Sequence, residues 1–473
     1  MAVLNQGNGV VAEVRDGTYG DAVATVEPGG AEFIPLSERH GKTWTLFGTW
    51  TSPNLEFATV FVGVIAVSFF GQSFWDAVLA IVVGTALGSI SHSFLCSRGP
   101  EFGVPQMVQS RISFGFIGNI LPAGLNSVTA GIGWFAVNSV SGALALNALL
   151  GVNDWVCLVF VGIAQTMLAF YGHNLIQLFE RWMLPLLGIA FVIASVVILS
   201  KSHPGAVHTT QGFGGFLLSV GASFGYACGW NPFGSDFTRY FKPGTGRSAG
   251  IWSGSGVFVS CIALEIVGAA SATIPGSNSN PTALFTSHMS TAVADITLIA
   301  IAFGAICANA LNVYSGVMSF LSTGIRMPLK WRRAVVALGF GSIGFVVAGT
   351  GLHNAGTDYE NFLLVIAYWI GPWLGVFLTD WLLRRGQRVD GFLFDRNHNP
   401  AAGAAAMLIG MAVSIPLFSN QTEFIGLIAK HNPSIGDLTF EVGFVVSAVL
   451  YWLFYSLSGG KRSEALVIPD EAA

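Results

Sequence analysis

The chain has 473 residues, of which 52% are hydrophobic and only 10% are charged, and it contains 37 Phe and 13 Trp. This composition is far more apolar than that of a soluble globular protein of the same length. It indicates an all-α polytopic membrane protein whose partner is the lipid bilayer. The formal net charge of −4 comes without a basic block, so nucleic acid is not expected as a partner.

The cysteines are scattered through apolar segments without C-x-x-C spacing, at Cys96, Cys157, Cys228, Cys261 and Cys307. This pattern predicts neither a disulfide framework nor a zinc site. The sequence also has no metal-binding cluster of His, Asp and Glu, no G-x-S-x-G motif and no phosphate-binding loop. We therefore expect no enzyme activity, no metal and no cofactor other than a coupling cation, H⁺ or Na⁺, and no obligate protein partner.

Residues 1–43 are polar, acidic-leaning and Gly-rich, which predicts a largely disordered tail and not a cleaved signal peptide. Apolar runs of roughly 20 residues follow, the length needed to cross about 30 Å of hydrocarbon as a helix. Twelve such spans are predicted, at residues 45–70, 74–95, 117–148, 154–172, 182–200, 212–235, 250–272, 293–322, 334–350, 360–383, 401–418 and 440–458.

The distribution of basic residues predicts the orientation. With a cytoplasmic N-terminus, all of the 21 lysines and arginines except Lys201 and Lys430 fall on the cytoplasmic side, as expected for a membrane protein. Both termini are therefore expected in the cytoplasm and the protein in the plasma membrane. The predicted organisation is a cytoplasmic tail at 1–43, a core at 44–385, two additional transmembrane helices at 386–460 and a cytoplasmic tail at 461–473.

Two of the spans are interrupted by helix-breaking residues. The first contains "TWTSPNLEF", with Pro53, and the sixth runs into "ACGWNPFGSDFTRY", with Pro232. Irregular backbone at membrane depth is tolerated only where it lines a cavity or is buried in protein. Because the breaks are five spans apart, they suggest inverted repeats of spans 1–5 and 6–10, with substrate and coupling ion bound where the half-helices end. A simple proline kink is the alternative for either break alone.

Five motifs follow one another along the chain: "GPEFGVPQMVQSRISFG" (99–115), "GIGWFAVNSVSG" (131–142), "YGHNLIQLFERW" (171–182), "GSDFTRYF" (234–241) and "ANALNVYSG" (308–316). In these motifs the chain resembles the nucleobase:cation symporter family, and specifically its purine-cytosine permease branch. The resemblance runs from about residue 40 to 460 and implies a LeuT-type fold of five plus five inverted spans with two extra helices. It also implies import of a nucleobase with a cation by alternating access; a nucleoside, hydantoin, allantoin or a vitamin such as pyridoxine is the alternative cargo.

A nucleobase site needs aromatic faces and amide groups around the ring edge, and stacking of a base on an aromatic ring is worth about 1–3 kcal/mol. Trp134 and Asn138 are four residues apart, so they share one face of the third span. The resemblance implies that both contact the substrate, as do Trp230 and Asn312. Packing for Trp134 and hydrogen bonding between helices for Asn138 are the alternatives, and the latter is also the role expected of Asn309.

Glu56 is a carboxylate inside the first span, where burial is costly and function is the default interpretation. Three roles are open for it: proton carrier, ligand for substrate N–H groups, or member of a buried pair. Asn54, at the same break, is a candidate substrate ligand. Glu265 and His92, also within predicted spans, are expected to be structural.

The resemblance places a sodium site between carbonyl groups of the first span and hydroxyl groups of the eighth. In this sequence the turns before Asn312 offer Cys307 but no Ser or Thr, which favours H⁺ over Na⁺ as the coupling cation. Ser315 or carbonyl groups alone remain alternatives. The candidates for cation coupling are therefore Glu56, Pro53 and Cys307.

Gate residues are expected at the ends of two spans. Asp236 and Arg239 follow the break in the sixth span at its cytoplasmic end and are candidates to tie an inner gate. Glu360 and Asn361 open the tenth span on the outer side, a place that the family uses for gating. Ordinary solvation at the rim is the alternative for Glu360 and Asn361.

Overall fold

The computed structural model describes residues 9–15, 19–23, 25–278, 280–325, 332–352, 355–458, 460 and 463–469. The helices are α1 (Thr45–Thr51), η2 (Ser52–Asn54), α2 (Phe57–Ser68), α3 (Phe74–Cys96), α4 (Gly99–Phe102), α5 (Gln106–Gln109), α6 (Arg111–Gly118), α7 (Ile120–Val128), η3 (Thr129–Trp134), α8 (Phe135–Leu150), α9 (Asp154–Tyr171), α10 (His173–Lys201), α11 (Gly212–Cys228), η4 (Asn231–Phe233), α12 (Gly234–Thr238), α13 (Gly246–Ser271), α14 (Pro281–Thr286), α15 (Thr291–Ser322), α16 (Arg332–Gly351), α17 (Ala355–Leu383), α18 (Ala402–Phe418), α19 (Leu427–His431) and α20 (Thr439–Ser458). Short 3-10 turns lie at Leu36–Glu38 (η1), Asp390–Leu393 (η5) and Pro433–Ile435 (η6).

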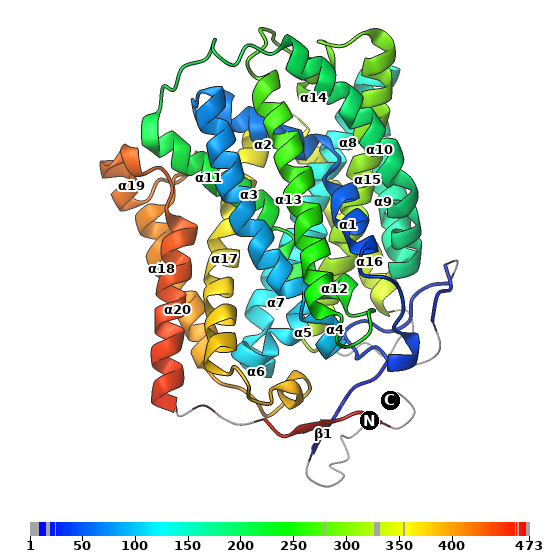
Figure 1. The fold of residues 1–473 in the computed structure, drawn as a ribbon, viewed down its shortest axis with the longest axis vertical. Helices are drawn as coiled ribbons and strands as arrows, with labels where there is room; N and C mark the ends of the chain where they lie inside the picture. The colour runs from blue at the N-terminus through cyan, green and yellow to red at the C-terminus, as the bar shows by residue number, and fades with distance from the viewer. Residues whose placement is uncertain are drawn as a thin grey trace.

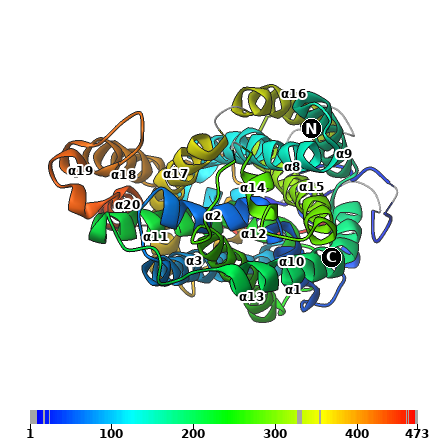
Figure 2. The same cartoon turned by 90° about the horizontal axis from the view of Figure 1, so that it is seen from above.

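The long helices run side by side between two faces of the molecule (Figure 1). One face carries β1 (Gly9–Val11) together with α4, α5, α6 and α12, and we call it the terminal face; the other, with α14 and α19, is the opposite face. At the terminal face β1 (Gly9–Val11) pairs in parallel with β2 (Ala465–Val467). Seen from above, α18 and α20 lie at one edge of the bundle, next to α17 (Figure 2).

Each predicted span overlaps a helix, which confirms the all-α polytopic class. Among the described residues, nine helices are long and apolar enough to cross a membrane, and α1 with η2 and α2 forms a tenth span bent by 59°. The helices α11 and α18 have only 17 residues each. The count of twelve spans therefore stays a prediction.

Both predicted breaks are present. The first span leaves helical geometry after Thr51, passes through η2 and turns extended at Glu56, with φ −152° and ψ 172°, before α2 begins. The second break separates α11 from α12 by the 3-10 turn η4, which contains Pro232. In each break proline removes a backbone donor and disfavours a continuous helix.

The prediction of a largely disordered tail at residues 1–43 is wrong for the part of the tail that the structure describes. Ala12 and Phe33 are buried in one apolar cluster with Val104 and Phe392. Apolar side chains at a few positions suffice for this docking, which the average composition of 43 residues conceals. Residues 1–8, 16–18 and 24, and residues 461, 462 and 470–473 of the predicted C-terminal tail, lie outside the described residues.

The helices α2 and α13 touch backbone to backbone. A Cβ atom built at Gly268 would lie 1.7 Å from the carbonyl oxygen of Val60, and one built at Gly63 would lie 1.7 Å from that of Glu265. Small residues allow such an approach between membrane helices. This contact fixes α2, the second half-helix of the first broken span, against α13.

We expect Gly268→Val to lower the melting temperature of the purified protein, because the new side chain forces α2 and α13 apart. Overpacking costs typically about 1–3 kcal/mol, and backbone atoms cannot yield as side chains do. Thermal unfolding in detergent measures the effect. Gly339→Ala is the control, because a Cβ there meets no atom within 4 Å; equal melting temperatures for Gly268→Val and the wild type would contradict the prediction.

Candidate functional site

The two breaks are joined directly by a side-chain hydrogen bond. The indole Nε1 of Trp230 donates to Oδ1 of Asn54 at 2.9 Å, and Nδ2 of Asn54 donates to the carbonyl of Trp50 at 2.8 Å. The Trp50 ring lies edge-on to that of Trp230, with centroids 5.8 Å apart. Asn54 therefore holds Trp230 in place as a link between the two broken spans.

Glu56 is 1% exposed and faces α11 across the first break. The hydroxyl of Tyr226 donates to its Oε1 at 3.3 Å, whereas Oε2 has no hydrogen-bond partner. Among the described residues no basic side chain forms an ion pair with Glu56. The arrangement leaves one carboxyl oxygen available for a proton or a ligand.

Trp134 ends a π-helical stretch, η3, in the middle of the third span. Such segments are rare and often occur at functional sites. Its ring lies edge-on to Tyr226, with centroids 5.6 Å apart, and a Cβ at Gly229 would lie 3.0 Å from its Cζ2 atom. The indole thus packs on the backbone of the second break, next to Trp230.

The amides form a cluster centred on Asn309. Its Oδ1 accepts hydrogen bonds from Nδ2 of Asn138 at 3.1 Å and of Asn312 at 3.2 Å. Its Nδ2 donates to the carbonyl of Phe135 and to Oε1 of Gln165, both at 2.9 Å. Asn309 therefore positions the other two amides, while Oδ1 of Asn138 has no partner. Gln165, which the sequence analysis missed, holds Asn309 from α9.

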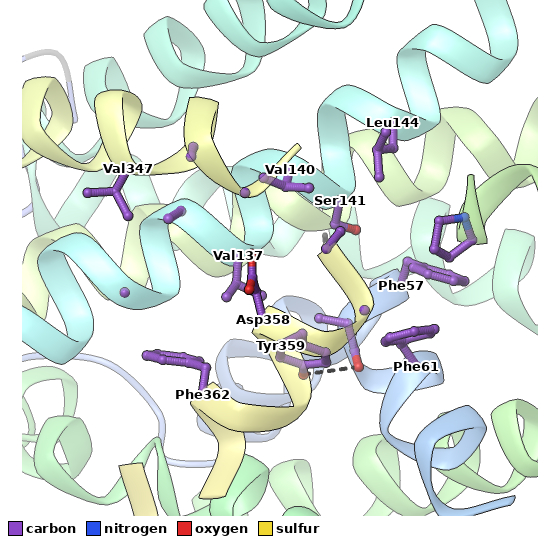
Figure 3. Close-up of a pocket in the computed structure, with 18 of the residues that line it drawn as sticks. Phe57, Phe61, Val137, Val140, Ser141, Leu144, Val347, Asp358, Tyr359 and Phe362 are labelled. Carbon is purple, nitrogen blue, oxygen red and sulfur yellow. Dashed lines mark hydrogen bonds between the residues drawn. The ribbon is translucent and has the colours of Figure 1, made fainter. Parts of the chain in front are cut away.

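A cavity of about 240 Å³ adjoins this site (Figure 3). Pro281 and Thr282 of α14, a helix at the opposite face, form part of its lining. Its lining is mostly apolar and comes from α2, α8, α14, α16 and α17. Tyr359 and Phe362 line it and also contact the Trp134 ring, with centroids 6.3 and 5.1 Å away. The Tyr359 hydroxyl donates to the carbonyl of Ala58 at 3.1 Å, which ties α17 to α2.

Glu360 and Asn361, the predicted outer gate residues, do not contact the Trp134 ring in the structure. Asn361 accepts a hydrogen bond from the backbone of Thr422 at 3.3 Å, outside the core, and Glu360 is half-buried. Their neighbours Tyr359 and Phe362 make the contacts instead. These two residues were missed by the sequence analysis, although their spacing of three places them on one helix face.

Asp236 and Arg239, which follow the second break, bind different segments of the chain. Oδ1 of Asp236 accepts from the backbone N–H of Gln106 at 2.8 Å, at the start of α5. Arg239 donates to the carbonyl of Gly30 at 3.0 Å and to the hydroxyl of Tyr314 at 3.2 Å. Arg239 therefore ties the end of the sixth span to the N-terminal segment and to α15.

Glu27, in that N-terminal segment, is 1% exposed and gathers three guanidinium groups. Its carboxylate oxygens lie 3.2 Å from Arg15, 3.6 Å from Arg239 and 3.7 Å from Arg333, and we call these four residues the Glu27 cluster. Burial by itself raises the pKa of Glu27, but Arg333, Arg15 and Arg239 outweigh it and lower that pKa to about 2. The cluster joins the N-terminal segment to the end of α12 and to α16, and of its four members the sequence analysis had singled out Arg239 alone.

A second buried acid, Glu180 on α10, lies on the other side of the first break. It is 1% exposed and sits beside Ser52 of η2 and Cys307 of α15, whose Oγ and Sγ atoms are 3.9 Å apart. The sequence analysis began the fifth span at residue 182 and so left Glu180 in a loop. Its spacing from the buried residues Ile176 and Leu187 was the available signal, since it places all three on one helix face.

Glu265 and His92 lie in the wall behind the first break. Oε2 of Glu265 accepts from the hydroxyl of Thr85 at 3.3 Å, and Nε2 of His92 is 3.2 Å from Sγ of Cys96. The His92 ring also packs edge-on against Trp50, with centroids 4.2 Å apart. The Thr85–Glu265 and Trp50–His92 contacts join neighbouring helices, whereas His92 and Cys96 both lie on α3.

Comparison with known proteins identifies relatives along almost the whole chain. A family model described as permease for cytosine/purines, uracil, thiamine and allantoin matches residues 33–443. The chain is 29% identical over 457 residues to the putative purine-cytosine permease YxlA of Bacillus subtilis, covering 93% of this chain and 98% of that protein. It is 27% identical over 475 residues to the purine-cytosine permease fcyB of Emericella nidulans, covering 92% and 91%.

Solved transporters share the fold. Mhp1, a nucleobase-cation-symport-1 family transporter in a closed conformation with bromovinylhydantoin bound, matches with a TM-score of 0.69 at 20% identity, over 91% of this chain and 95% of that one. A Na⁺-coupled sialic acid symporter matches with a TM-score of 0.61 at 12% identity, over 90% and 92%. These likenesses confirm the LeuT-type fold.

Proposed function

The chain belongs to the family of permeases for cytosine, purines, uracil, thiamine and allantoin, so it is a membrane transporter and not an enzyme. We propose that it imports a nucleobase, either cytosine or a purine, by symport with a cation. The proposal rests mainly on one observation: aromatic rings (Trp134 and Trp230) and a cluster of amides (Asn138, Asn309 and Asn312) lie in the same region of the protein as the two breaks. Trp134 packs on the second break, and the Asn138 Oδ1 atom next to it is buried without a partner. An unpaired buried acceptor is costly unless a ligand satisfies it.

The proposed roles follow from the chemistry of a base. Trp134 and Trp230 supply aromatic faces for stacking, and Asn138 and Asn312 supply the donor and acceptor pair that an amide offers to a ring edge. Asn54 contributes by fixing the Trp230 indole. Glu56, whose Oε2 is unpaired, binds substrate N–H groups or carries a proton.

We propose H⁺ in preference to Na⁺ as the coupling cation, because Cys307 occupies the α15 face at the first break and a thiol is a poor ligand for a hard cation. The proposed orientation puts the terminal face in the cytoplasm, with the protein in the plasma membrane, as the distribution of Lys and Arg predicts. In alternating access, the Glu27 cluster then closes the inner side, and Tyr359 and Phe362 close the outer side.

Uptake by proteoliposomes tests the proposal. Radiolabelled cytosine, adenine and hypoxanthine are offered under a pH gradient, acidic outside, or under a sodium gradient, each imposed separately. We expect saturable uptake of at least one base, driven by the pH gradient and not by sodium. Uptake of none of the bases under either gradient would contradict the proposal and direct the search to nucleosides, hydantoins, allantoin and vitamins.

A further inference from the structure

Glu180 is a buried acid that the proposed substrate site does not use. It projects from α10 into the junction of three elements, with Ser52 from the broken span and Cys307 from α15 as its polar neighbours. The Ser52 hydroxyl donates to Sγ of Cys307, and neither carboxyl oxygen of Glu180 has a hydrogen-bond partner. The next residue along the helix, Arg181, is exposed and so lies on the other side of α10.

No positive charge compensates Glu180. Among the described residues it forms no ion pair, and neither α9 nor α13, which also pack on α10, presents a charged group to it. The titratable group that faces it is the Cys307 thiol. An ionised carboxylate buried without a partner inside a membrane is expensive, so this arrangement requires the charge of Glu180 to be neutralised.

The place of Glu180 links this charge to the substrate site. The α15 helix meets the first break twice within one turn: a Cβ at Gly304 would lie 2.3 Å from the Leu55 carbonyl oxygen, and Cys307 contacts Ser52. Two residues after Cys307 comes Asn309, which positions Asn138 and Asn312. A change in the charge of Glu180 therefore affects Asn309, and with it Asn138 and Asn312, through α15 alone.

From this geometry we propose that Glu180 is the proton-binding residue of the coupling site, and that a proton on its carboxyl group takes the place of a metal cation between η2 and α15. The proton comes from the outer solution, adds to a carboxylate oxygen and leaves to the cytoplasm after the site has changed its access. This proposal rests on the proposed function. The proposal gives different roles to the two acids near the first break. Glu56 faces Tyr226 and the proposed substrate site, whereas Glu180 faces Ser52 and Cys307 at the proposed cation site.

Substitution by glutamine tests the proposal, because Glu180→Gln mimics the protonated carboxyl group and cannot release a proton. We expect the variant to exchange labelled for unlabelled base across the membrane within about 3-fold of the wild-type rate, since the neutral state is the one that closes around substrate. We expect concentrative uptake to be lost. With one proton per base, a gradient of one pH unit supports about tenfold accumulation in the wild type, and none in the variant.

Two further variants make the outcome decisive. Glu180→Asp keeps a titratable group and should retain accumulation driven by the pH gradient, whereas Arg181→Gln changes the exposed neighbour and should behave as the wild type. Accumulation by Glu180→Gln with the wild-type pH dependence would overturn the inference, as would loss of exchange in both Glu180→Gln and Glu180→Asp. A wild-type protein driven by sodium instead of pH would overturn it as well, and absence of any base uptake by the wild type would overturn the proposed function itself.

Discussion

Replacing Asn312 with Ala is expected to weaken nucleobase binding by roughly 5- to 150-fold, the equivalent of about 1–3 kcal/mol for a lost amide pair with a base edge. Asn312 is 1% exposed and is held by a hydrogen bond to Asn309, so its amide is fixed before substrate arrives. The substitution removes both the donor and the acceptor that the amide presents. The KM for uptake by proteoliposomes measures the loss, and competition by unlabelled bases shows whether selectivity falls with it.

Asn432→Ala is the matched control for this prediction. Asn432 is exposed near the opposite face, and its amide donates to the Ile428 carbonyl within the same segment. We expect its KM to equal that of the wild type. An Asn312→Ala protein with unchanged KM and unchanged selectivity would remove Asn312 from the substrate site.

Replacing Glu27 with Gln is expected to destabilise the protein by about 3–5 kcal/mol, the usual cost of breaking a buried ion pair. The variant leaves the guanidinium groups of Arg15, Arg239 and Arg333 facing one another without the carboxylate that now lies 3.2 to 3.7 Å from them. A fall in melting temperature, measured by thermal unfolding of the purified protein in detergent, reports the loss.

Glu13→Gln is the control, because Glu13 pairs with Arg396 at 3.1 Å near the surface, where the side chains are 55% and 34% exposed. Exposed pairs of this kind contribute about 0–1 kcal/mol, so we expect almost no change in melting temperature. If Glu27→Gln were as stable as Glu13→Gln, the Glu27 cluster would not be the clamp of the terminal face.

The pH dependence of the same cluster follows from the pKa of Glu27, which is lowered from 4.5 to about 2. Because folding favours the ionised carboxylate, the stabilisation is fully present above about pH 4.5 and is lost as the pH falls through about 2. The cluster therefore stays intact between pH 5 and pH 8, roughly the range of a proton-driven uptake assay. A pH effect on transport in that range must arise elsewhere, and Glu180 is the group to which we assign it.

The places where the sequence was read correctly share a physical cause. The long apolar segments could be found without a structure because a membrane-spanning helix must satisfy its own backbone and cover its sides with apolar atoms. The two breaks could be found because Pro53 and Pro232 cannot continue a helix. Trp134 and Trp230 were named from their motifs and lie at the second break, and Asn138 and Asn312 meet at Asn309, whereas their contact with substrate stays a prediction.

The residues that the sequence analysis missed depend on contacts between distant segments. Gln165 matters only because α9 packs beside Asn309, and Tyr359 and Phe362 only because α17 crosses next to Trp134. Glu180 and Glu27 looked like ordinary charges of loops, since no local pattern shows which side of a helix is covered or which arginines converge.

The sequence by itself determined the class of protein, the helical segments, the two broken spans and the family, because hydropathy, proline geometry and local motifs are written along the chain. Only the tertiary structure decided which polar groups lack a partner, which acids are buried and how the N-terminal segment seals the terminal face. Burial and electrostatic pairing are properties of three-dimensional neighbours, and those neighbours come from segments as far apart as Glu27 and Arg333.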